Sequence, residues 1–502
     1  MGKCIYLRKG ETHTKPIPSI LAASLNIGDV VKLNEGGVET EFIVVNQGLP
    51  DGSLYDISCN GTWLLRKDIK ENRVWDGNSN NTYSTSAINT WLNGDYFNSL
   101  GSVEQDLVKQ VKIPYVNGTG SGGSIASGSN GLSVRAFLLG GYEVGWTTSD
   151  NQYFPQDGAK LSYFESGEST SANNKRIANL NGSATHWWLR SPKNNNASSV
   201  WFVDTSGVYS YTSASYSYSY GVRPALIIPF TAKFNSETKV LVGGGNSLPY
   251  LMFTSPESFT LSVNNATKNW DGTLQYSTDT TNWAEWDGTT TLSSVGNRLY
   301  LRGVGNSVIT GGRTTTNKRW AFSGSNIGCN GNIENLLDYQ TVSAGEHPVM
   351  AASCYENLFR ECSSLIVAPN LLAVALSAFC YNGMFSRCTA LTNVPALPAT
   401  TLADACYGGM FNTCTSLITL PNLPASVLVV DCYASMFASC SKIKLSATQT
   451  GTYTQEYRIP ISGTGTTASS VLSNMFYNTG GTFTGTPEIN TTYYLDSSNY
   501  IV

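Results

Sequence analysis

Cysteine is the residue type with the greatest chemical potential in this chain, and its spacing is regular. Eight of the 11 cysteines form pairs whose members lie eight residues apart, and the pairs recur every 26 residues. They are Cys354/Cys362, Cys380/Cys388, Cys406/Cys414 and Cys432/Cys440. A zinc site would need closer spacing, and two cysteines eight apart on a helix lie about 12 Å apart, too far for a disulfide within one unit. We therefore predict reduced, buried thiols that belong to a structural repeat.

The other residues that could support catalysis or metal binding are scattered. The three histidines, His13, His186 and His347, lie far apart, and none belongs to an HExxH motif. His186 could take part in catalysis or bind zinc beside two tryptophans, but a packing role is favoured. A glycan-processing enzyme would need a convergent pair of carboxylates, and an oxidase would need a reactive cysteine. The sequence indicates neither, so we predict a protein that is not an enzyme and has no metal and no cofactor.

A binding surface made of Tyr, Ser and Asn is the stronger candidate. Between Asn194 and Tyr220 the chain holds three Asn, eight Ser and five Tyr, but a single charged residue, Asp204. Antibody paratopes favour these residue types, because Tyr offers a large contact area at low entropic cost and Ser offers adaptable hydrogen bonds. A disordered linker is the alternative, but residues 209–220 contain no Pro or Gly and run directly into an apolar segment. The predicted ligand-binding residues are Asn194, Asn195, Asn196, Ser198, Ser199, Tyr209, Tyr211, Ser213, Ser215, Tyr216, Tyr218 and Tyr220.

The tyrosines of this surface change parity along the chain. Tyr209 and Tyr211 are odd-numbered, whereas Tyr216, Tyr218 and Tyr220 are even-numbered. One continuous strand would point the two sets to opposite faces, because side chains alternate along a strand. We predict a turn at 212–215 that brings both sets into one patch. The core expected beneath this patch consists of Trp187, Trp188, Trp201 and Val222.

Composition narrows the class of protein. Only 13% of the residues are charged, about half the usual share, and Asn, Ser, Thr, Gly and Tyr take their place. This composition is typical of β-rich extracellular or virion proteins. The net charge is −4 without a basic stripe, which argues against nucleic-acid binding. No signal peptide is visible, and the longest later apolar run, 370–379, is too short for membrane insertion.

A chain of 502 residues exceeds one ordinary core, so we expect several domains. Strand patterns with Asp-Gly turns at 271–272 and 287–288 predict a small β-sandwich, in which three tryptophans favour core packing over a sugar platform. Because a Gly-rich bridge precedes it, residues 251–502 are expected to fold alone. The predicted segments are an N-terminal attachment segment (1–25), an α+β ligand-binding domain (26–232), a linker (233–250), the β-sandwich (251–322), an α/β repeat solenoid (323–490) and a C-terminal tail (491–502).

The repeat has the pattern CYxxMFxxC. These positions form one stripe on a helix of 3.6 residues per turn, so we predict helices whose Cys, Tyr, Met and Phe side chains face inward. Each helix would lead into a short extended segment, "LxxxPxLP". Four units would bury a continuous core, and residues 471–483 are expected to form a fifth, degenerate unit.

Two resemblances extend this interpretation. "WWLRSP" (187–192) and the later "GVRPAL" (221–226) are similar to C-type-lectin-fold variable proteins of diversity-generating retroelements, over about residues 26–230. That resemblance implies a C-type-lectin-like fold whose Asn, Tyr and Ser codons are diversified. The same superfamily includes formylglycine-generating oxidases that use paired cysteines, but here only Cys4 and Cys59 are available. Residues 323–490 resemble BspA-like leucine-rich repeats of bacterial surface antigens and gut-phage proteins.

Together these patterns favour a receptor-binding protein of a phage tail, located in the virion and acting outside the cell. The expected partners are a host cell-surface protein or glycan, and other virion proteins through the N-terminal segment. The alternative is a bacterial cell-surface adhesin that binds mainly through its leucine-rich repeats.

Overall fold

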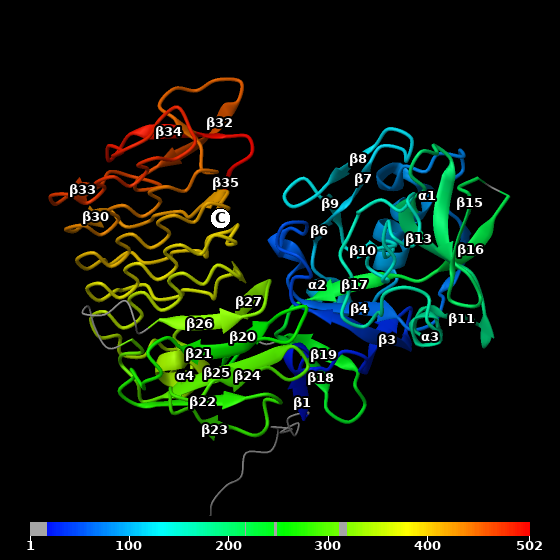
Figure 1. The fold of residues 1–502 in the computed structure, drawn as a ribbon, viewed down its shortest axis with the longest axis horizontal. Helices are drawn as coiled ribbons and strands as arrows, with labels where there is room; N and C mark the ends of the chain where they lie inside the picture. Colours follow the sequence, from blue (N-terminus) through cyan, green and yellow to red (C-terminus); the bar gives the residue numbers. More distant parts are fainter. Residues whose placement is uncertain (1–17, 216, 245–247, 311–318) are drawn as a thin grey trace, which may run out of the picture.

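The chain folds mainly into β-strands joined by turns, with a few short helices (Figure 1). The computed structural model describes residues 18–215, 217–244, 248–310 and 319–502. Residues 18–244 form a first half with two five-stranded sheets, and residues 248–502 form a second half with a six-stranded sheet and a stack of repeated turns. The expected multidomain, β-rich architecture agrees with this arrangement at the level of sheets and turns.

The first half is organised around two sheets. Its first sheet is wholly antiparallel, in the order β10 (Ala136–Phe137), β17 (Ala225–Ile228), β4 (Thr62–Arg66), β3 (Val38–Gln47) and β2 (Val30–Glu35). Its second sheet has the order β15 (Tyr209–Ser213), β14 (Ser199–Val203), β13 (Trp187–Pro192), β16 (Ser219–Val222) and β5 (Glu71–Val74). The strands β4, β13 and β17 are almost wholly buried, and their apolar residues at 63–65, 187–189 and 225–228 belong to the core of the first half.

The first half also contains short helices. They are α1 (Ala87–Trp91), which continues as a π-helical turn over Leu92–Tyr96, α2 (Ser102–Leu107) and α3 (Thr170–Arg176). The Ser86 hydroxyl caps α1 by accepting a hydrogen bond from the Asn89 amide. The spacing of Ile88, Trp91, Leu92 and Tyr96 predicts one apolar helical face. Ile88, Leu92 and Tyr96 are buried, whereas Trp91 is only half-buried.

Three segments that were expected to lie outside the domains contribute strands. β1 (Ser19–Leu21) pairs with β18 (Ala232–Asn235), and β18 pairs with β19 (Leu241–Gly244). At the other end, β34 (Thr492–Asp496) pairs with β32 (Tyr453–Arg458) and β31 (Leu445–Ser446). The attachment segment, as far as it is described, the linker and the C-terminal tail are therefore largely part of the fold.

The sheets of the second half share one hydrophobic core with the repeats. The six-stranded sheet has the order β23 (Ala284–Glu285), β22 (Thr273–Ser277), β25 (Arg298–Val304), β20 (Leu251–Thr254), β27 (Ile327–Asn330) and β28 (Leu365–Val367). The smaller sheet has the order β24 (Leu292–Ser293), β21 (Thr260–Val263) and β26 (Trp320–Ser323). Because β28 belongs to the first repeat and pairs with β27, no break in the core separates the sheets from the repeats.

The repeats are stacked turns, and the prediction of a helix in each unit is wrong. Every fourth residue of a unit adopts a left-handed backbone conformation, as at Ser353, Asn357 and Glu361, with φ of 59°, 61° and 65°. An α-helix cannot continue through such residues. Alternate amides bond to the next unit instead: Tyr355 N donates to Cys380 O at 3.0 Å.

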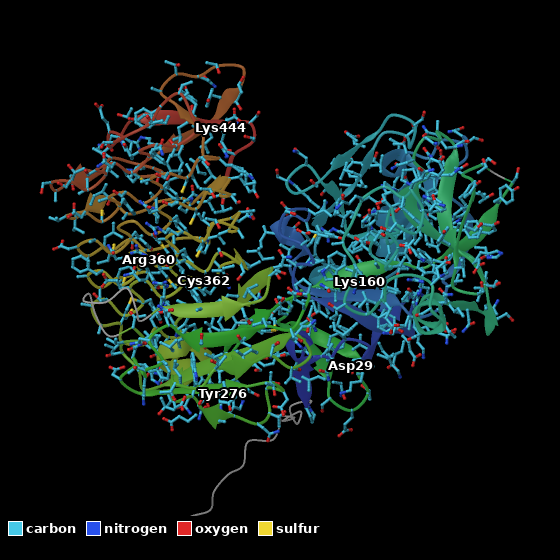
Figure 2. All side chains as sticks on the ribbon, viewed as in Figure 1. Asp29, Lys160, Tyr276, Arg360, Cys362 and Lys444 are labelled. Atoms are coloured by element: carbon cyan, nitrogen blue, oxygen red, sulfur yellow. The ribbon has the colours of Figure 1, made fainter. Side chains whose placement is uncertain are left out.

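The inward stripe of the repeat is nevertheless as predicted. Its Cys, Tyr, Met and Phe side chains are buried, and the aromatic rings of successive units stack 5.5–5.8 Å apart. Phe476 continues the stack on Phe437, so the degenerate fifth unit takes its expected place. Sulfur atoms lie inside this stack, where Figure 2 labels Cys362. The residues inserted before the fifth unit form β32, near the C-terminal end of the stack.

The two halves are in contact. Arg298 is 3% exposed, and its Nη1 donates to the carbonyl oxygens of Ala23, at 3.1 Å, and Leu25. Ile366 of the first repeat packs in the core of the first half. Residues 251–502 therefore present buried groups to the first half, which the Gly-rich bridge did not indicate.

The repeat thiols are expected to react slowly in the folded protein. Burial raises the pKa of Cys388 and Cys414 well above that of a free thiol, and the thiolate is the reactive form. Labelling with a maleimide should be slow in the native state and complete in denaturant, as followed by mass spectrometry. Fast labelling of the native repeat thiols, or repeat cysteines already joined as disulfides, would contradict this prediction.

Candidate functional site

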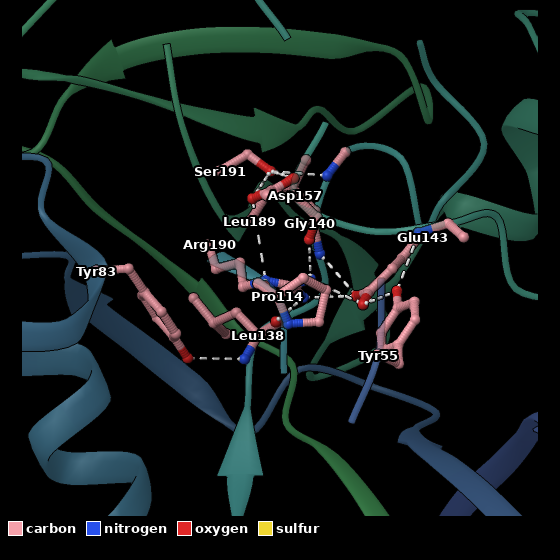
Figure 3. A network of polar contacts seen from close by, with 12 residues as sticks. Tyr55, Tyr83, Pro114, Leu138, Gly140, Glu143, Asp157, Leu189, Arg190 and Ser191 are labelled. Carbon is pink, nitrogen blue, oxygen red and sulfur yellow. Dashed lines mark hydrogen bonds and ion pairs between the residues drawn. The ribbon is translucent and has the colours of Figure 1, made fainter. Parts of the chain in front are cut away.

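The "WWLRSP" motif forms β13, in the centre of the second sheet, and its arginine is the centre of a buried polar network (Figure 3). Arg190 makes a bidentate ion pair with Glu143, at 2.6 and 2.8 Å, with both side chains fully buried. Its remaining N–H groups donate to the carbonyl oxygens of Pro114, Leu138 and Asp157. All five donors of the guanidinium are thus satisfied.

Two more side chains complete the network. The Tyr55 hydroxyl donates to Glu143 Oε1 at 2.7 Å, and Ser191 donates to both carboxylate oxygens of Asp157 at 2.8 and 2.9 Å. Burial raises the pKa of Asp157 to about 6, against the opposing effects of Arg190 and Ser191. Tyr, Glu, Asp, Ser and Arg together resemble an active site in residue type. Because all five are buried, the network positions backbone segments rather than meeting a substrate.

The predicted binding residues lie around this sheet. Tyr211 on β15 is 49% exposed, its ring meets Trp201 edge-on at 5.4 Å, and Lys193 Nζ lies 4.0 Å from its centroid. Lys193 also lies 4.8 Å from the ring centre of Tyr153. We call Tyr153, Lys193 and Tyr211 the Tyr211 surface. Tyr209, beside it, is half-buried against Trp201, and its hydroxyl donates to Asp150 O at 3.0 Å.

A second aromatic surface lies near β16. Tyr220 packs on the buried rings of Trp188 and Phe202, both at 4.7 Å, and touches His186 at 5.0 Å. The 41% exposed Tyr218 adjoins it at 6.1 Å.

On the neighbouring strand, Arg73 pairs with Tyr220, and its guanidinium lies 4.0 Å over the ring of Trp91. We call Arg73, Trp91, His186, Tyr218 and Tyr220 the Tyr220 surface. None of its members is fully buried.

These two surfaces lie on opposite faces of one sheet, so the prediction of a single tyrosine patch is wrong. Tyr211 contacts Trp201, whereas Tyr220 contacts Phe202. Trp201 and Phe202 are consecutive in β14 and therefore point to opposite sides. The chain does turn after β15. However, β16 pairs with the edge of β13 opposite to the edge that pairs with β14, so the odd-numbered and even-numbered tyrosines still point to opposite faces.

The Asn and Ser residues form an ordered turn near the Tyr211 surface. Asn196 Oδ1 accepts hydrogen bonds from the amides of Ser198 and Ser199 at 2.8 and 2.7 Å, while the Asn194 amide donates to Tyr153 O at 2.9 Å. Asn195 is exposed, with φ of 64°. Ser213 pairs with Ser199 across the strands, Ser215 is half-buried, and Tyr216 lies outside the described residues.

Sequence reasoning missed Arg73, Trp91 and His186 as members of a binding surface. Arg73 and Trp91 lie more than 90 residues before the tyrosines, and only the pairing of β16 with β5 brings them together. His186 stood out in the sequence, but no local pattern indicated its ring contacts. Trp270 and Trp286 are buried, so the alternative of an exposed sugar platform in the β-sandwich is not supported.

Among residues 18–215, 217–244, 248–310 and 319–502, no three His, Cys, Asp or Glu side chains are grouped as metal ligands would be. In the same described part of the chain, every helix is too short or too polar to span a bilayer.

Replacing Glu143 by Gln should destabilise the protein strongly. The change leaves the buried Arg190 charge without its bidentate partner, a loss that commonly costs about 3–5 kcal/mol of unfolding free energy. Glu39→Gln, at an exposed ion pair with Lys32, is the control and should cost under about 1 kcal/mol. Urea denaturation measures both variants, and equal midpoints would show that the network does not stabilise the fold.

Asp157 should give stability a specific dependence on pH. Because its pKa is raised from 3.8 to about 6 in the folded state, the folded protein holds this proton more tightly than the unfolded chain does. The free energy of unfolding contributed by Asp157 is therefore highest below pH 3.8 and falls as pH rises to about 6. Asp157→Asn should remove this downward contribution from the stability–pH curve measured by denaturation. Identical curve shapes for the variant and the wild type would contradict the raised pKa.

Comparison with known proteins identifies one related region. A family model described as a domain of unknown function, DUF6273, matches residues 60–230. The matched segment contains β13 and both aromatic surfaces. No curated protein and no solved structure matches the chain.

Proposed function

We propose that this protein is a non-enzymatic receptor-binding protein that recognises a host cell-surface protein or glycan through exposed tyrosines of its first half. The observation that carries the proposal is the Tyr220 surface, where partly exposed rings rest on the buried Trp188 and Phe202. Rigid aromatic side chains with a fixed base lose little entropy on binding. Tyr and Arg are also enriched among residues that dominate binding energy.

The arrangement suits a surface whose side chains vary while the fold is constant. Strand pairing uses the backbone groups of β15 and β16, and the motif residues Trp187, Trp188 and Arg190 are buried. A change at Tyr218 would alter the exposed surface without opening the core. This separation supports a C-type-lectin-like variable protein of a diversity-generating retroelement, carried on a phage tail. Figure 1 places β15 and β16 at the end of the first half that is remote from the stack, where a partner has access.

Tyr218→Ser should weaken binding without unfolding the protein. Loss of an interface tyrosine commonly costs about 2 kcal/mol of binding free energy, or about a thirtyfold rise in Kd. Stability should change by under about 1 kcal/mol because the ring is 41% exposed. The measurement is binding of fluorescent protein to a panel of bacterial strains by flow cytometry, with melting curves recorded in parallel.

Tyr211→Ser is the matched control, since Tyr211 is similarly exposed on the opposite face of the sheet. It should leave binding unchanged. Loss of binding in Tyr211→Ser alone would assign recognition to the Tyr211 surface. Unchanged binding in both variants would contradict the proposal that tyrosines of this sheet recognise the receptor.

A further inference from the structure

A polar groove runs across the stacked repeats and is independent of both aromatic surfaces. Its volume is about 690 Å³, and its lining comes from equivalent positions of successive units, from Glu356 in the first to Ser473 in the last. Arg360, labelled in Figure 2, and Arg387 contribute charge, and Asn382 and Asn412 contribute amides. Asn and Ser side chains recur along the groove, although the side chain at an equivalent position differs from one unit to the next.

Glu356 indicates that the groove receives a ligand. Glu356 is only 9% exposed, and its Oε2 atom has no hydrogen-bond partner among the described residues. Leaving a buried carboxylate oxygen unsatisfied is costly. Arg360 Nε also lacks a hydrogen bond, although it lies 3.7 Å from Glu361. Two residues of the first unit that line the groove therefore hold an unused acceptor and an unused donor.

The lining favours a carbohydrate over an extended peptide. A peptide bound by strand addition needs free backbone groups. Here Asn357 N already donates to Asn382 O at 2.9 Å, and Gly383 N donates to Gly408 O at 2.9 Å. The side chains in the groove are mostly Asn, Ser, Arg, Glu and Asp, which offer both donors and acceptors to hydroxyl groups. Few apolar side chains are present to anchor a peptide.

We propose that this groove binds an uncharged linear glycan that lies along the axis of the stack, with sugar hydroxyls donating to the Glu356 carboxylate. Successive aromatic rings of the stack lie 5.5–5.8 Å apart, which is close to the length that one sugar adds to an extended β-linked chain. One sugar per unit would place equivalent hydroxyls beside equivalent positions of the repeat, with Glu356 in the first unit and Asn382 in the second. This inference does not rest on the tyrosine surfaces.

The test uses the full chain and isothermal titration with hexasaccharides of β-linked glucose, mannose and N-acetylglucosamine. Asn412→Trp should block the groove, and the fold should tolerate it because Arg360 holds a large side chain at the equivalent position. Val427→Trp, at a position 61% exposed and outside the groove, is the matched control. At least one hexasaccharide should bind, with affinity reduced at least tenfold by Asn412→Trp and unchanged by Val427→Trp. If no hexasaccharide binds, or if Asn412→Trp binds normally, the proposal fails.

Glu356→Gln separates a ligand-binding role from a structural one. Neutralising an unpartnered buried carboxylate should raise the melting temperature, while loss of the stronger acceptor should lower hexasaccharide affinity about tenfold. A lowered melting temperature with unchanged affinity would show that Glu356 is structural and would overturn its assigned role. Tyr218→Ser should not change hexasaccharide binding, so a failure of the proposed receptor surface and a failure of this groove give different results.

Discussion

The charge of Arg190 is the constraint on which the first half depends. A fully buried guanidinium cannot lose its proton, so every one of its donors must find an acceptor within the protein. Those acceptors come from Glu143, Asp157 and the carbonyl groups of Pro114 and Leu138, which lie on segments far apart in the sequence. The hydrogen bonds of the Arg190 side chain therefore hold several loops against β13. Because β14 and β16 both pair with β13, the network also fixes the two faces that carry the tyrosines.

Features that depend on a local sequence pattern could be predicted, whereas features that depend on distant contacts could not. Burial of the Cys, Tyr and Phe side chains follows from a repeat that is visible in the sequence, and so does the continuation of the stack at Phe476. The local backbone was mispredicted, because a stripe at helical spacing and a series of four-residue turns place the same side chains inward. Left-handed residues distinguish the two. Ser, Asn, Glu, Phe and Arg all occur at those positions, so composition gave no warning.

The candidate site shows the same limit at longer range. Exposure of Tyr211 and Tyr218 could be predicted from a tract rich in Tyr and Ser, and the parity difference was visible. Whether the tyrosines form one patch or two depends on which edge of β13 pairs with the strand after the turn. Tertiary contacts, not the local sequence, determine that pairing. The same pairing brings Arg73 to Tyr220, a contact that no local pattern contains. The role of the tyrosines in binding stays a prediction.

The two candidate binding surfaces differ in how freely they can change. Tyr220 occupies an extended strand position, where any side chain is compatible with the backbone. In the groove, Gly383 lies at a left-handed position with φ of 59°, which glycine adopts most readily. An added Cβ at Gly383 would also come within 2.4 Å of Asn357 Oδ1. Gly383 can therefore change less freely than an extended strand position, which suits a ligand that is constant. The open strand positions suit a partner that differs from one host to the next.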